Sequence, residues 1–480
     1  MSDQLSRRDW IKAATALGAG ALLPDSSNAQ PATRPTEAPG QSYDTFTAAE
    51  QVKADEFFPK INFAYYPPLP KPVSAIVCGY GMRGRTYAGF AQTVPDEWKI
   101  VGVAEPIEYK RNDAVATHKL APENVFDSWE KVFERPKFAD VVVVSMQDAM
   151  HVAPALRAIE AGYDILLEKP IAQRWEECEQ IRDAAKKHNR IVAVCHVLRY
   201  APYFMMMREV IRSGKIGKPI TVQHMEPVWN IHFSHSYVRG PWRRKAESNP
   251  VIIAKSCHDT DLIYFLLDRK VTRVSSYGDL QYFRKENAPA GAPQFCMDGC
   301  PVQATCPYFA PDVYVNKKKW NTGHIVTADR SPEGILAALK QGQYGRCVYH
   351  CDNDVCDHMV TIMELEGGGT ASFHLTGLAG KPDRRTRIAC QRGWIEGDQI
   401  NLTVWDFEKG TSYTWNANAA ANVGGGHGGG DLRLVRDFCQ AVSLRDVGKL
   451  TSNLDESMLS HLICYKAEES RCDGGRPREL

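Results

Sequence analysis

Short apolar runs alternate with helix-length segments from residue 73 onward, and this alternation limits the fold more than any other feature of the chain. The apolar runs are 73–79 (VSAIVCG), 99–105 (KIVGVAE), 139–145 (ADVVVVS), 164–170 (DILLEKP) and 190–196 (RIVAVCH). Strands that are apolar throughout are buried on both faces, and helices between them supply the cover. The pattern therefore predicts a doubly wound parallel sheet.

A glycine-rich turn, with Gly79, Gly81 and Gly84, follows the first predicted strand and opens a helix. In this setting the first glycine permits the turn, the second lets a pyrophosphate approach, and the third lets the helix pack on the strand. The helix N-terminus then faces the phosphates. The turn predicts a dinucleotide site.

An acidic residue, Glu105, ends the second predicted strand, 21 residues beyond Gly84. A carboxylate there accepts hydrogen bonds from ribose hydroxyls and repels a 2′-phosphate, which favours NAD. Arg111 lies just beyond and could offset that repulsion, so NADP stays open. The predicted cofactor-binding residues are Gly79, Tyr80, Gly81, Met82, Arg83, Gly84, Glu105, Arg111, Ser145, Gln147, His151, Glu168 and Lys169.

The pattern changes after residue 219 to longer runs in which apolar and polar residues alternate. These runs are 220–233 (ITVQHMEPVWNIHF), 271–283 (VTRVSSYGDLQYF), 358–377 (HMVTIMELEGGGTASFHLTG), 385–398 (RTRIACQRGWIEGD) and 400–415 (INLTVWDFEKGTSYTW). Alternation of this kind predicts an antiparallel or mixed sheet with one face covered. We therefore predict two domains, residues 71–198 and 199–480.

Several motifs occur in a recognisable order: the glycine turn, 141–151 (VVVVSMQDAMH), 161–172 (AGYDILLEKPIA), 199–204 (RYAPYF) and 213–219 (SGKIGKP). In this order the chain resembles the glucose–fructose oxidoreductase, inositol dehydrogenase and MocA-like family (Gfo/Idh/MocA). The resemblance implies a Rossmann domain followed by a C-terminal α/β domain. The open sheet of that second domain would join a homodimer or homotetramer.

The resemblance also implies that the lysine of the Glu-Lys-Pro motif, here Lys169, lies beside the nicotinamide and handles a substrate hydroxyl. From the residues alone, Lys169 ends an apolar strand, and ligands of open α/β sheets bind outside the carboxyl ends of the strands. A partly desolvated lysine there can act as a base.

A helix predicted over residues 254–268 carries the other catalytic candidates. Lys255, His258 and Asp261 are spaced by three residues and would share a helical face. Family members usually carry Asp-x-x-x-His here, and the histidine accepts the substrate proton. His258 matches that histidine, but Ala254 stands where the aspartate would be, which leaves Lys255 as the nearest polar group. The predicted catalytic residues are Lys169, His258 and Lys255.

A second glycine-rich segment, 424–431 (GGGHGGGD), carries His427 and Asp431. The resemblance favours a loop that lines a sugar site, with both residues in contact with hydroxyls. Further substrate candidates are Arg199, Tyr203, Trp229, His232, Trp242 and Asp261. For the aromatic residues, ordinary core packing is an equal alternative.

Fourteen cysteines are many for a chain of this length, and several fall in a Pro-rich insertion at about 285–356. Three thiolates from one loop, Cys296, Cys300 and Cys306, together with Cys351, could hold a tetrahedral structural zinc. Disulfides are the equal alternative for an exported protein.

The N-terminal segment 6–12 (SRRDWIK), a weakly apolar run over 13–23 and small residues at 27–29 have the layout of a twin-arginine export signal. We predict a signal over 1–29, a linker over 30–70, recognition by the twin-arginine machinery and a periplasmic location. That route carries folded proteins, so the dinucleotide would be loaded first, held tightly and recycled within each catalytic cycle.

The net charge is +1 and no basic cluster follows the signal, so neither nucleic acid nor a membrane is an expected partner. The expected function is an NAD(P)-dependent oxidoreductase that acts on a secondary hydroxyl of a sugar, glycoside or polyol. One alternative is an NAD-dependent glycoside hydrolase that works through transient C3 oxidation and elimination. A dinucleotide-binding sensor without catalysis is the other.

Overall fold

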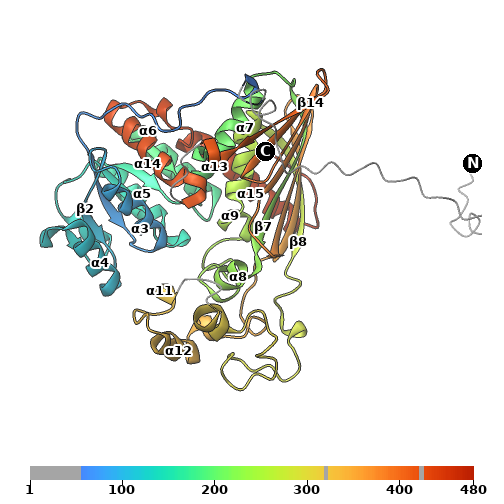
Figure 1. Ribbon diagram of the computed structural model, residues 1–480. Coiled ribbons are helices and arrows are strands. Elements are labelled where there is room, and N and C mark those ends of the chain that lie inside the picture. The colour runs from blue at the N-terminus through green and yellow to red at the C-terminus, as the bar shows by residue number, and fades with distance from the viewer. Residues whose placement is uncertain (1–53, 55, 318–322, 421–425) are drawn as a thin grey trace, which may run out of the picture. The chain divides into compact units, whose positions relative to one another are not determined.

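The computed structural model describes residues 54, 56–317, 323–420 and 426–480, which all belong to one compact unit (Figure 1). The predicted export signal and most of the predicted linker lie outside the described residues. Within the described residues, no helix is both long and apolar enough to cross a bilayer.

The first sheet has six parallel strands in the order β3-β2-β1-β4-β5-β6. The strands are β1 (Val73–Cys78), β2 (Trp98–Ala104), β3 (Val125–Phe126), β4 (Val141–Val144), β5 (Asp164–Leu167) and β6 (Val192–Val194). Four helices connect them, α3 (Met82–Gly89), α4 (Glu108–His118), α5 (Val152–Glu160) and α6 (Trp175–Lys187). The predicted doubly wound sheet is confirmed. Its strand order reverses at β1 and β4, where ligands of such sheets bind.

The second sheet has nine strands in the order β14-β13-β12-β11-β7-β10-β9-β8-β15. They are β7 (Pro219–Trp229), β8 (Val271–Asp279), β9 (His358–Leu365), β10 (Thr370–Ala379), β11 (Arg385–Cys390), β12 (Gly393–Gly397), β13 (Asn401–Asp406), β14 (Thr411–Asn416) and β15 (Arg478–Glu479). Only β7 and β10 pair in parallel; the other pairs are antiparallel. The predicted mixed sheet is confirmed.

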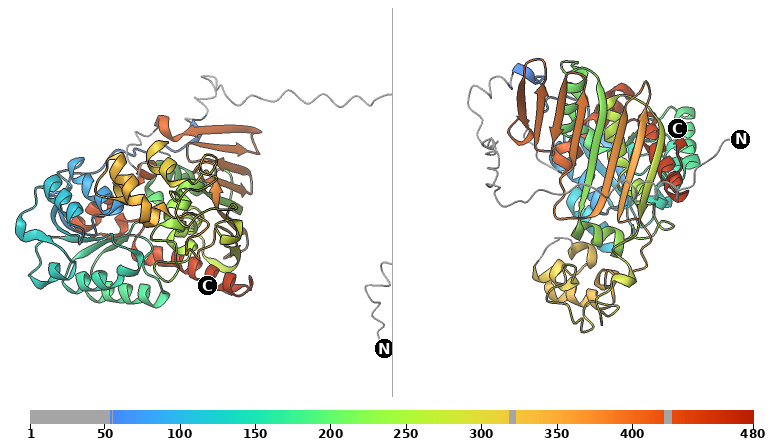
Figure 2. Two further views of the ribbon diagram at one scale, coloured as in Figure 1. Left: turned by 90° about the horizontal axis from the view of Figure 1, so that it is seen from below. Right: turned by 90° about the vertical axis from the view of Figure 1, so that its right-hand side faces the viewer.

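Helices cover one face of this second sheet, and the other face is bare in the right-hand view of Figure 2. The helices of the second domain include α7 (Pro202–Arg212), α10 (Cys257–Leu267) and α15 (Leu454–Cys472). Of these, α10 packs on β7 and β10, and α15 packs on β8. The bare face exposes apolar side chains, among them Met225, Tyr277 and Ile362.

The end of the chain returns to the first domain. Helix α14 (Gly426–Leu444) places Leu434 and Phe438 in the same core as Trp98, at the start of β2. Arg436 of this helix also forms an ion pair with Glu97. The predicted division at residues 198 and 199 did not include this return, because nothing local in the sequence indicates a partner more than 300 positions away.

Residues 56–70 are not the loose tether that the sequence predicted. Phe57 and Phe58 are buried, and Phe57 stacks on Tyr413 of β14 with ring centroids 4.2 Å apart. Farther on, the guanidinium of Arg436 lies 3.8 Å from the ring centroid of Tyr66. These aromatic side chains bury enough apolar surface to hold a segment that has little regular secondary structure.

The insertion between β8 and β9 contains two short helices, α11 (Gly323–Val326) and α12 (Pro332–Gln341). Residues 288–309 form no helix and no strand, apart from an isolated bridge between Phe295 and Arg346. The predicted loop-like character of this segment agrees with the structure.

Candidate active site

The glycine turn after β1 has the geometry that a dinucleotide requires. Gly79 has a φ of +90°, and a Cβ at Gly84 would lie 2.0 Å from the Gly79 carbonyl oxygen. A Cβ at Gly81 would meet no atom within 4 Å, so this position faces open space. Ser145, just after β4, supports the turn by donating to the Gly79 carbonyl at 2.8 Å. The turn therefore fits a pyrophosphate at the N-terminus of α3.

Glu105 is buried directly after β2 and organises the same turn. One carboxylate oxygen accepts the Tyr80 N–H at 2.7 Å, and the other accepts the Ile107 N–H at 3.0 Å. A carboxylate has about four acceptor positions, so lone pairs remain for ribose hydroxyls. Arg111 instead donates to the main-chain carbonyl of Glu105 at 2.6 Å. The residues therefore fit NAD at this position.

Glu168 lies at the carboxyl end of β5 and connects the cofactor helix to the Glu-Lys-Pro motif. Its carboxylate accepts from Tyr87 Oη at 2.6 Å, from Arg83 Nε at 2.7 Å and from the Lys169 N–H at 2.8 Å. Burial acts to raise the pKa of Glu168, but the charges of Arg83 and Lys169 outweigh it and the pKa falls below its usual value. Glu168 is therefore an anion that aligns the main chain of Lys169.

The second glycine-rich segment joins this cluster through Asp431. The Asp431 carboxylate pairs with Arg83 at 2.7 Å and lies 3.1 Å from His427 Nδ1. Because Asp431 is buried and held by these two side chains, the structure gives it an anchoring role instead of the predicted substrate contact. His427, with an exposed side chain, is the residue of this loop that can reach a ligand.

Lys169 and His258 lie together beyond the end of β5. Lys169 precedes a cis peptide bond to Pro170, and its Nζ donates to the carbonyl of Ala254 at 2.6 Å. Ala254 ends α9 (Val251–Ala254), just before α10, which carries His258. Burial, and then the charge of Lys169, lower the pKa of His258 well below its usual value. His258 is therefore a neutral imidazole beside a lysine, and can accept a proton.

The predicted common face of Lys255, His258 and Asp261 is wrong for Lys255, because the helix breaks there between α9 and α10, while His258 and Asp261 stay three residues apart within α10. Lys255 Nζ lies 3.4 Å from Glu226 on β7. Asp261 forms a buried bidentate ion pair with Arg199, with both distances at 2.7 Å. Of the three, only Lys255 and His258 remain catalytic candidates.

Several other residues predicted to contact substrate or cofactor instead contact other groups of the protein. Arg199 and Asp261 satisfy each other in the interior, and Tyr203 is buried in the core against Phe204. His151 lies 2.7 Å from the Pro170 carbonyl and so supports the turn that bears Lys169. The substrate contacts predicted for Arg199, Tyr203 and Asp261 are therefore not supported.

Trp229 and His232 lie at the end of β7 and in α8 (Asn230–Phe233), where both are partly exposed. Burial and the charge of Lys255 lower the pKa of His232 well below its usual value. Trp242 donates to Asp148, in the loop after β4, at 3.0 Å and so joins the two domains. Trp229 and His232 remain candidates for substrate contact.

A charged network that no sequence pattern indicated lies beside Lys255. Arg384 pairs with Glu226 and, at 2.6 Å, with Asp259, whose carboxylate also lies 3.1 Å from His224. These residues come from β7, from α10 and from the segment before β11. Only the register of the sheet brings them together, so no local pattern could have indicated them.

The predicted zinc site is not assembled in the structure. Among the described residues, no group of three or more His, Cys, Asp and Glu side chains is arranged around a metal position, and all fourteen cysteines are free thiols. Cys351, one of the four predicted ligands, donates to the Cys347 carbonyl at 3.3 Å.

Two family models match the chain. The model described as "Oxidoreductase family, NAD-binding Rossmann fold" matches residues 73–196, and the model "GFO/IDH/MocA C-terminal domain" matches residues 204–396. The two matches follow one another in the expected order.

Several relatives are named as oxidoreductases, reductases or dehydrogenases. "Putative oxidoreductase YteT" of Bacillus subtilis (strain 168) is 26% identical over 332 residues, which are 66% of this chain and 74% of that protein. The "scyllo-inositol 2-dehydrogenase (NAD(+))" of the same organism is 28% identical over 206 residues, 43% of this chain and 57% of that enzyme. The "1,5-anhydro-D-fructose reductase" of Ensifer adhaerens is 29% identical over 37% of this chain and 55% of that enzyme.

The fold is also similar to that of a solved structure, an inositol dehydrogenase homolog from Azotobacter vinelandii complexed with NADH and myo-inositol. The TM-score is 0.61 at 16% identity, over 86% of this chain and 98% of that one. With the glycine turn, Glu105 and the Glu-Lys-Pro motif in place, the chain belongs to the Gfo/Idh/MocA family of NAD-binding oxidoreductases.

Proposed function

We propose that this protein transfers a hydride between NAD and a secondary carbinol carbon of a sugar, glycoside or polyol. The observation that carries the proposal is the placement of Lys169 beside a neutral His258 at the carboxyl edge of the sheet that binds the dinucleotide. The relatives named above as inositol dehydrogenase and anhydrofructose reductase support the substrate class. NAD, when bound, supplies the hydride acceptor or donor.

Two residues would handle the proton of the reacting hydroxyl. Lys169 Nζ has one N–H directed at the Ala254 carbonyl, which leaves two donors for the substrate oxygen. His258, neutral and with Nδ1 buried without a partner among the described residues, would take the hydroxyl proton as the hydride leaves the carbon. In reduction the same imidazole returns the proton.

The test is to replace these two residues and assay a panel of sugars and polyols with NAD and NADH. Lys169→Met and His258→Asn should each lower kcat by roughly 10²–10⁴-fold, which is the usual contribution of a positioned acid or base. NADH binding, followed by nicotinamide fluorescence, should be retained. Lys270→Met, an exposed lysine before β8, is the matched control and should leave turnover unchanged. Full turnover in both variants would refute the proposed roles.

The same panel separates the other two functions. Release of the aglycone from aryl glycosides without added oxidant and without net NADH would indicate the redox-assisted glycoside hydrolase. Bound dinucleotide with no turnover on any sugar would indicate a sensor.

We further propose that the protein is exported by the twin-arginine route and keeps its NAD through the catalytic cycle. The N-terminal motif around Arg7 and Arg8 supports export, and a compartment without a free NAD pool would require retention. Denaturation of the purified protein should release about one dinucleotide per chain, as a bound cofactor of the Rossmann type would give. Replacement of Arg7 and Arg8 by lysine should leave the protein in the cytoplasm. A purified protein without bound dinucleotide would refute retention of NAD. Export of the lysine variant would refute the twin-arginine route.

The bare face of the nine-stranded sheet supports a further proposal, that two or four chains associate through it. Its exposed apolar residues, including Met225, Tyr277 and Ile362, would be covered in such an assembly. The molar mass from light scattering should be that of a dimer or tetramer. The Ile362→Glu variant should have a molar mass closer to that of the monomer. A monomeric parent protein would exclude this assembly.

A further inference from the structure

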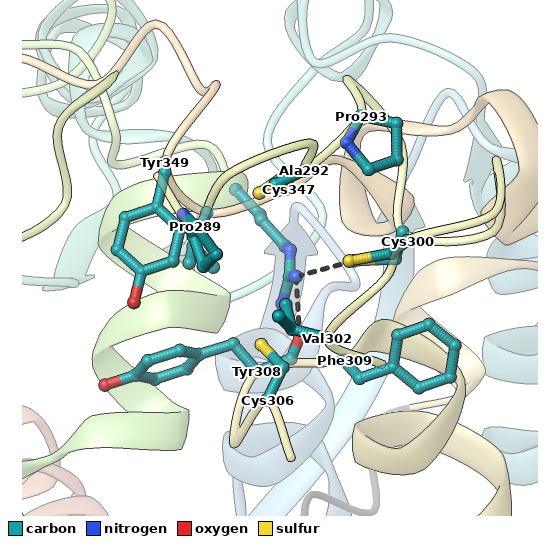
Figure 3. A pocket seen from close by; sticks show the side chains of 13 residues that line it. Pro289, Ala292, Pro293, Cys300, Val302, Cys306, Tyr308, Phe309, Cys347 and Tyr349 are labelled. Carbon is teal, nitrogen blue, oxygen red and sulfur yellow. Dashed lines mark hydrogen bonds between the residues drawn. The ribbon is translucent and has the colours of Figure 1, made fainter. Parts of the chain in front are cut away.

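A small cavity lies inside the insertion, away from the residues of the candidate active site. Its volume is about 10 Å³, and four cysteines line it: Cys296, Cys300, Cys306 and Cys347 (Figure 3). Such a volume holds about one water-sized particle, which is compatible with a single ion. The cysteines come from two stretches of the insertion, one around 296–306 and one at 347.

Arg239 lines the same cavity and is completely buried. It is the last residue of η6 (Ser234–Arg239), a π-helical turn directly after α8. Its Nε donates to the Arg346 carbonyl at 2.7 Å, and Nη2 donates to the Tyr308 carbonyl at 2.8 Å. Nη1 has no hydrogen-bond partner, and no carboxylate of the described residues forms an ion pair with this guanidinium.

A buried guanidinium without a countercharge is strongly unfavourable. The anionic groups that the cavity can provide are thiolates, and Arg239 Nη2 already lies 3.5 Å from Cys296 Sγ. Neutral thiols supply no countercharge, whereas four thiolates around a divalent ion carry a net charge of about −2. A metal at this position would therefore supply the negative charge that Arg239 lacks.

Main-chain N–H groups lie near two of the four sulfurs. The N–H of Tyr308 is near Cys306, and the N–H of Tyr349 is near Cys347, in two segments with the same spacing, CPY and CVY. Donors of this kind stabilise ligand thiolates from outside the coordination sphere.

The segment around the cavity also needs a covalent or metal constraint. Residues 288–309 have no helix or strand, yet Cys296 and Cys300 within them are buried. Irregular segments of this length are uncommon in compact domains, and small irregular elements are usually held by disulfides or metals.

We propose that Cys296, Cys300, Cys306 and Cys347 bind one structural Zn²⁺ as a tetrahedral tetrathiolate site, with Arg239 as its buried counter-ion. Binding releases four thiol protons and forms four Zn–S bonds, with no change of oxidation state. The sulfurs are not gathered at ligand distance in the described structure, so binding requires rotation about the χ1 bonds of the cysteines. Relative to the site predicted from the sequence, Cys347 replaces Cys351, which does not line the cavity.

The site would also affect the neighbourhood of the substrate. Arg239 ends the turn that continues from α8, which carries His232. The metal would therefore tie the insertion to a segment beside Lys255. Loss of zinc should raise KM for the substrate more than it lowers kcat.

The test is the metal content of the full-length protein, purified without chelator. Mass spectrometry of the elements should find about one zinc per chain, as a closed structural site requires. Cys306→Ser and Cys347→Ser should each lower zinc at least about tenfold. The matched controls are Cys351→Ser, which removes a half-buried thiol, and Cys472→Ser, which removes an exposed thiol. Both variants should keep their zinc.

A second measurement needs no variant. The parent protein, exchanged with Co²⁺, should show thiolate-to-cobalt charge-transfer bands and tetrahedral ligand-field bands. A parent protein without stoichiometric metal, or with a disulfide among the four cysteines, would overturn the site. Iron in place of zinc would overturn the metal assignment. If Cys347→Ser kept its zinc and Cys351→Ser lost it, the proposed ligand set would be overturned.

Discussion

Replacement of His461 by glutamine should change how the stability of this protein depends on pH. His461, in α15, is fully buried, with Nδ1 2.9 Å from the Ser457 carbonyl and Nε2 3.2 Å from the Ile171 nitrogen. The Ile171 N–H can donate only to an unprotonated Nε2, so the folded state requires the neutral ring. Burial accordingly lowers the pKa of His461 to about 3.

The direction and the magnitude of this pH effect on stability follow from proton linkage. The folded pKa lies below the unfolded value of about 6.5, so the unfolded chain binds the proton first and stability is lost as the pH falls below about 6.5. Between pH 7 and pH 5 the unfolded histidine gains most of a proton and the folded one gains almost none. At about 1.4 kcal/mol per pH unit, His461 alone lowers the free energy of unfolding by about 2 kcal/mol over this interval.

Glutamine can keep both hydrogen bonds of His461, with its amide N–H toward Ser457 and its oxygen toward Ile171, but it does not titrate. Urea unfolding followed by tryptophan fluorescence at pH 7, 6 and 5 would give the free energy of unfolding of each protein. The parent protein should lose about 2 kcal/mol more than His461→Gln between pH 7 and pH 5. His188→Gln, partly exposed at the end of α6 and away from the nine-stranded sheet, is the control and should follow the parent protein. Parallel pH curves for the parent protein and His461→Gln would refute the reasoning.

Two further predictions concern the cofactor turn and the buried ion pair. Gly84→Ala would place a Cβ 2.0 Å from the Gly79 carbonyl oxygen and should weaken NADH binding by roughly tenfold or more, measured by fluorescence titration. Gly89→Ala, where a Cβ meets no atom within 4 Å, should bind normally, and equal affinities would contradict the packing role of Gly84. Arg199→Met should lower the free energy of unfolding by about 3–5 kcal/mol, because Asp261 is left as an unpaired buried charge. Unchanged stability with a raised KM would instead restore a substrate role for Arg199.

The strands and the cofactor turn were predictable because their signals are local. Each run of alternating residues from 358 to 415 became a strand pair, and the three glycines with Glu105 have the positions that a dinucleotide requires. The Glu-Lys-Pro motif also indicated the correct edge of the first sheet. In these segments the side-chain period or the backbone conformation is decided by neighbours in sequence.

What the sequence could not predict depends on contacts between distant segments. The network of Glu226, Asp259 and Arg384 exists because β7 and β11 pair in one particular register. Arg199 was predicted to contact substrate because its partner, Asp261, lies 62 positions away and is indicated by no pattern. A polar residue near a site and a polar residue satisfied in the core have the same local sequence.

The return of α14 to the first domain has a consequence for the order of events during synthesis. The side chains of Leu434 and Phe438 fill part of the core that surrounds Trp98. A ribosome adds about 5–20 residues per second, so roughly 230 residues and roughly 10–50 s separate completion of β6 from the arrival of this helix. During that time the nascent Rossmann domain lacks a piece of its interior, so apolar surface near Trp98 stays open to chaperones. Emergence of α14 from the ribosome is then the event that closes it.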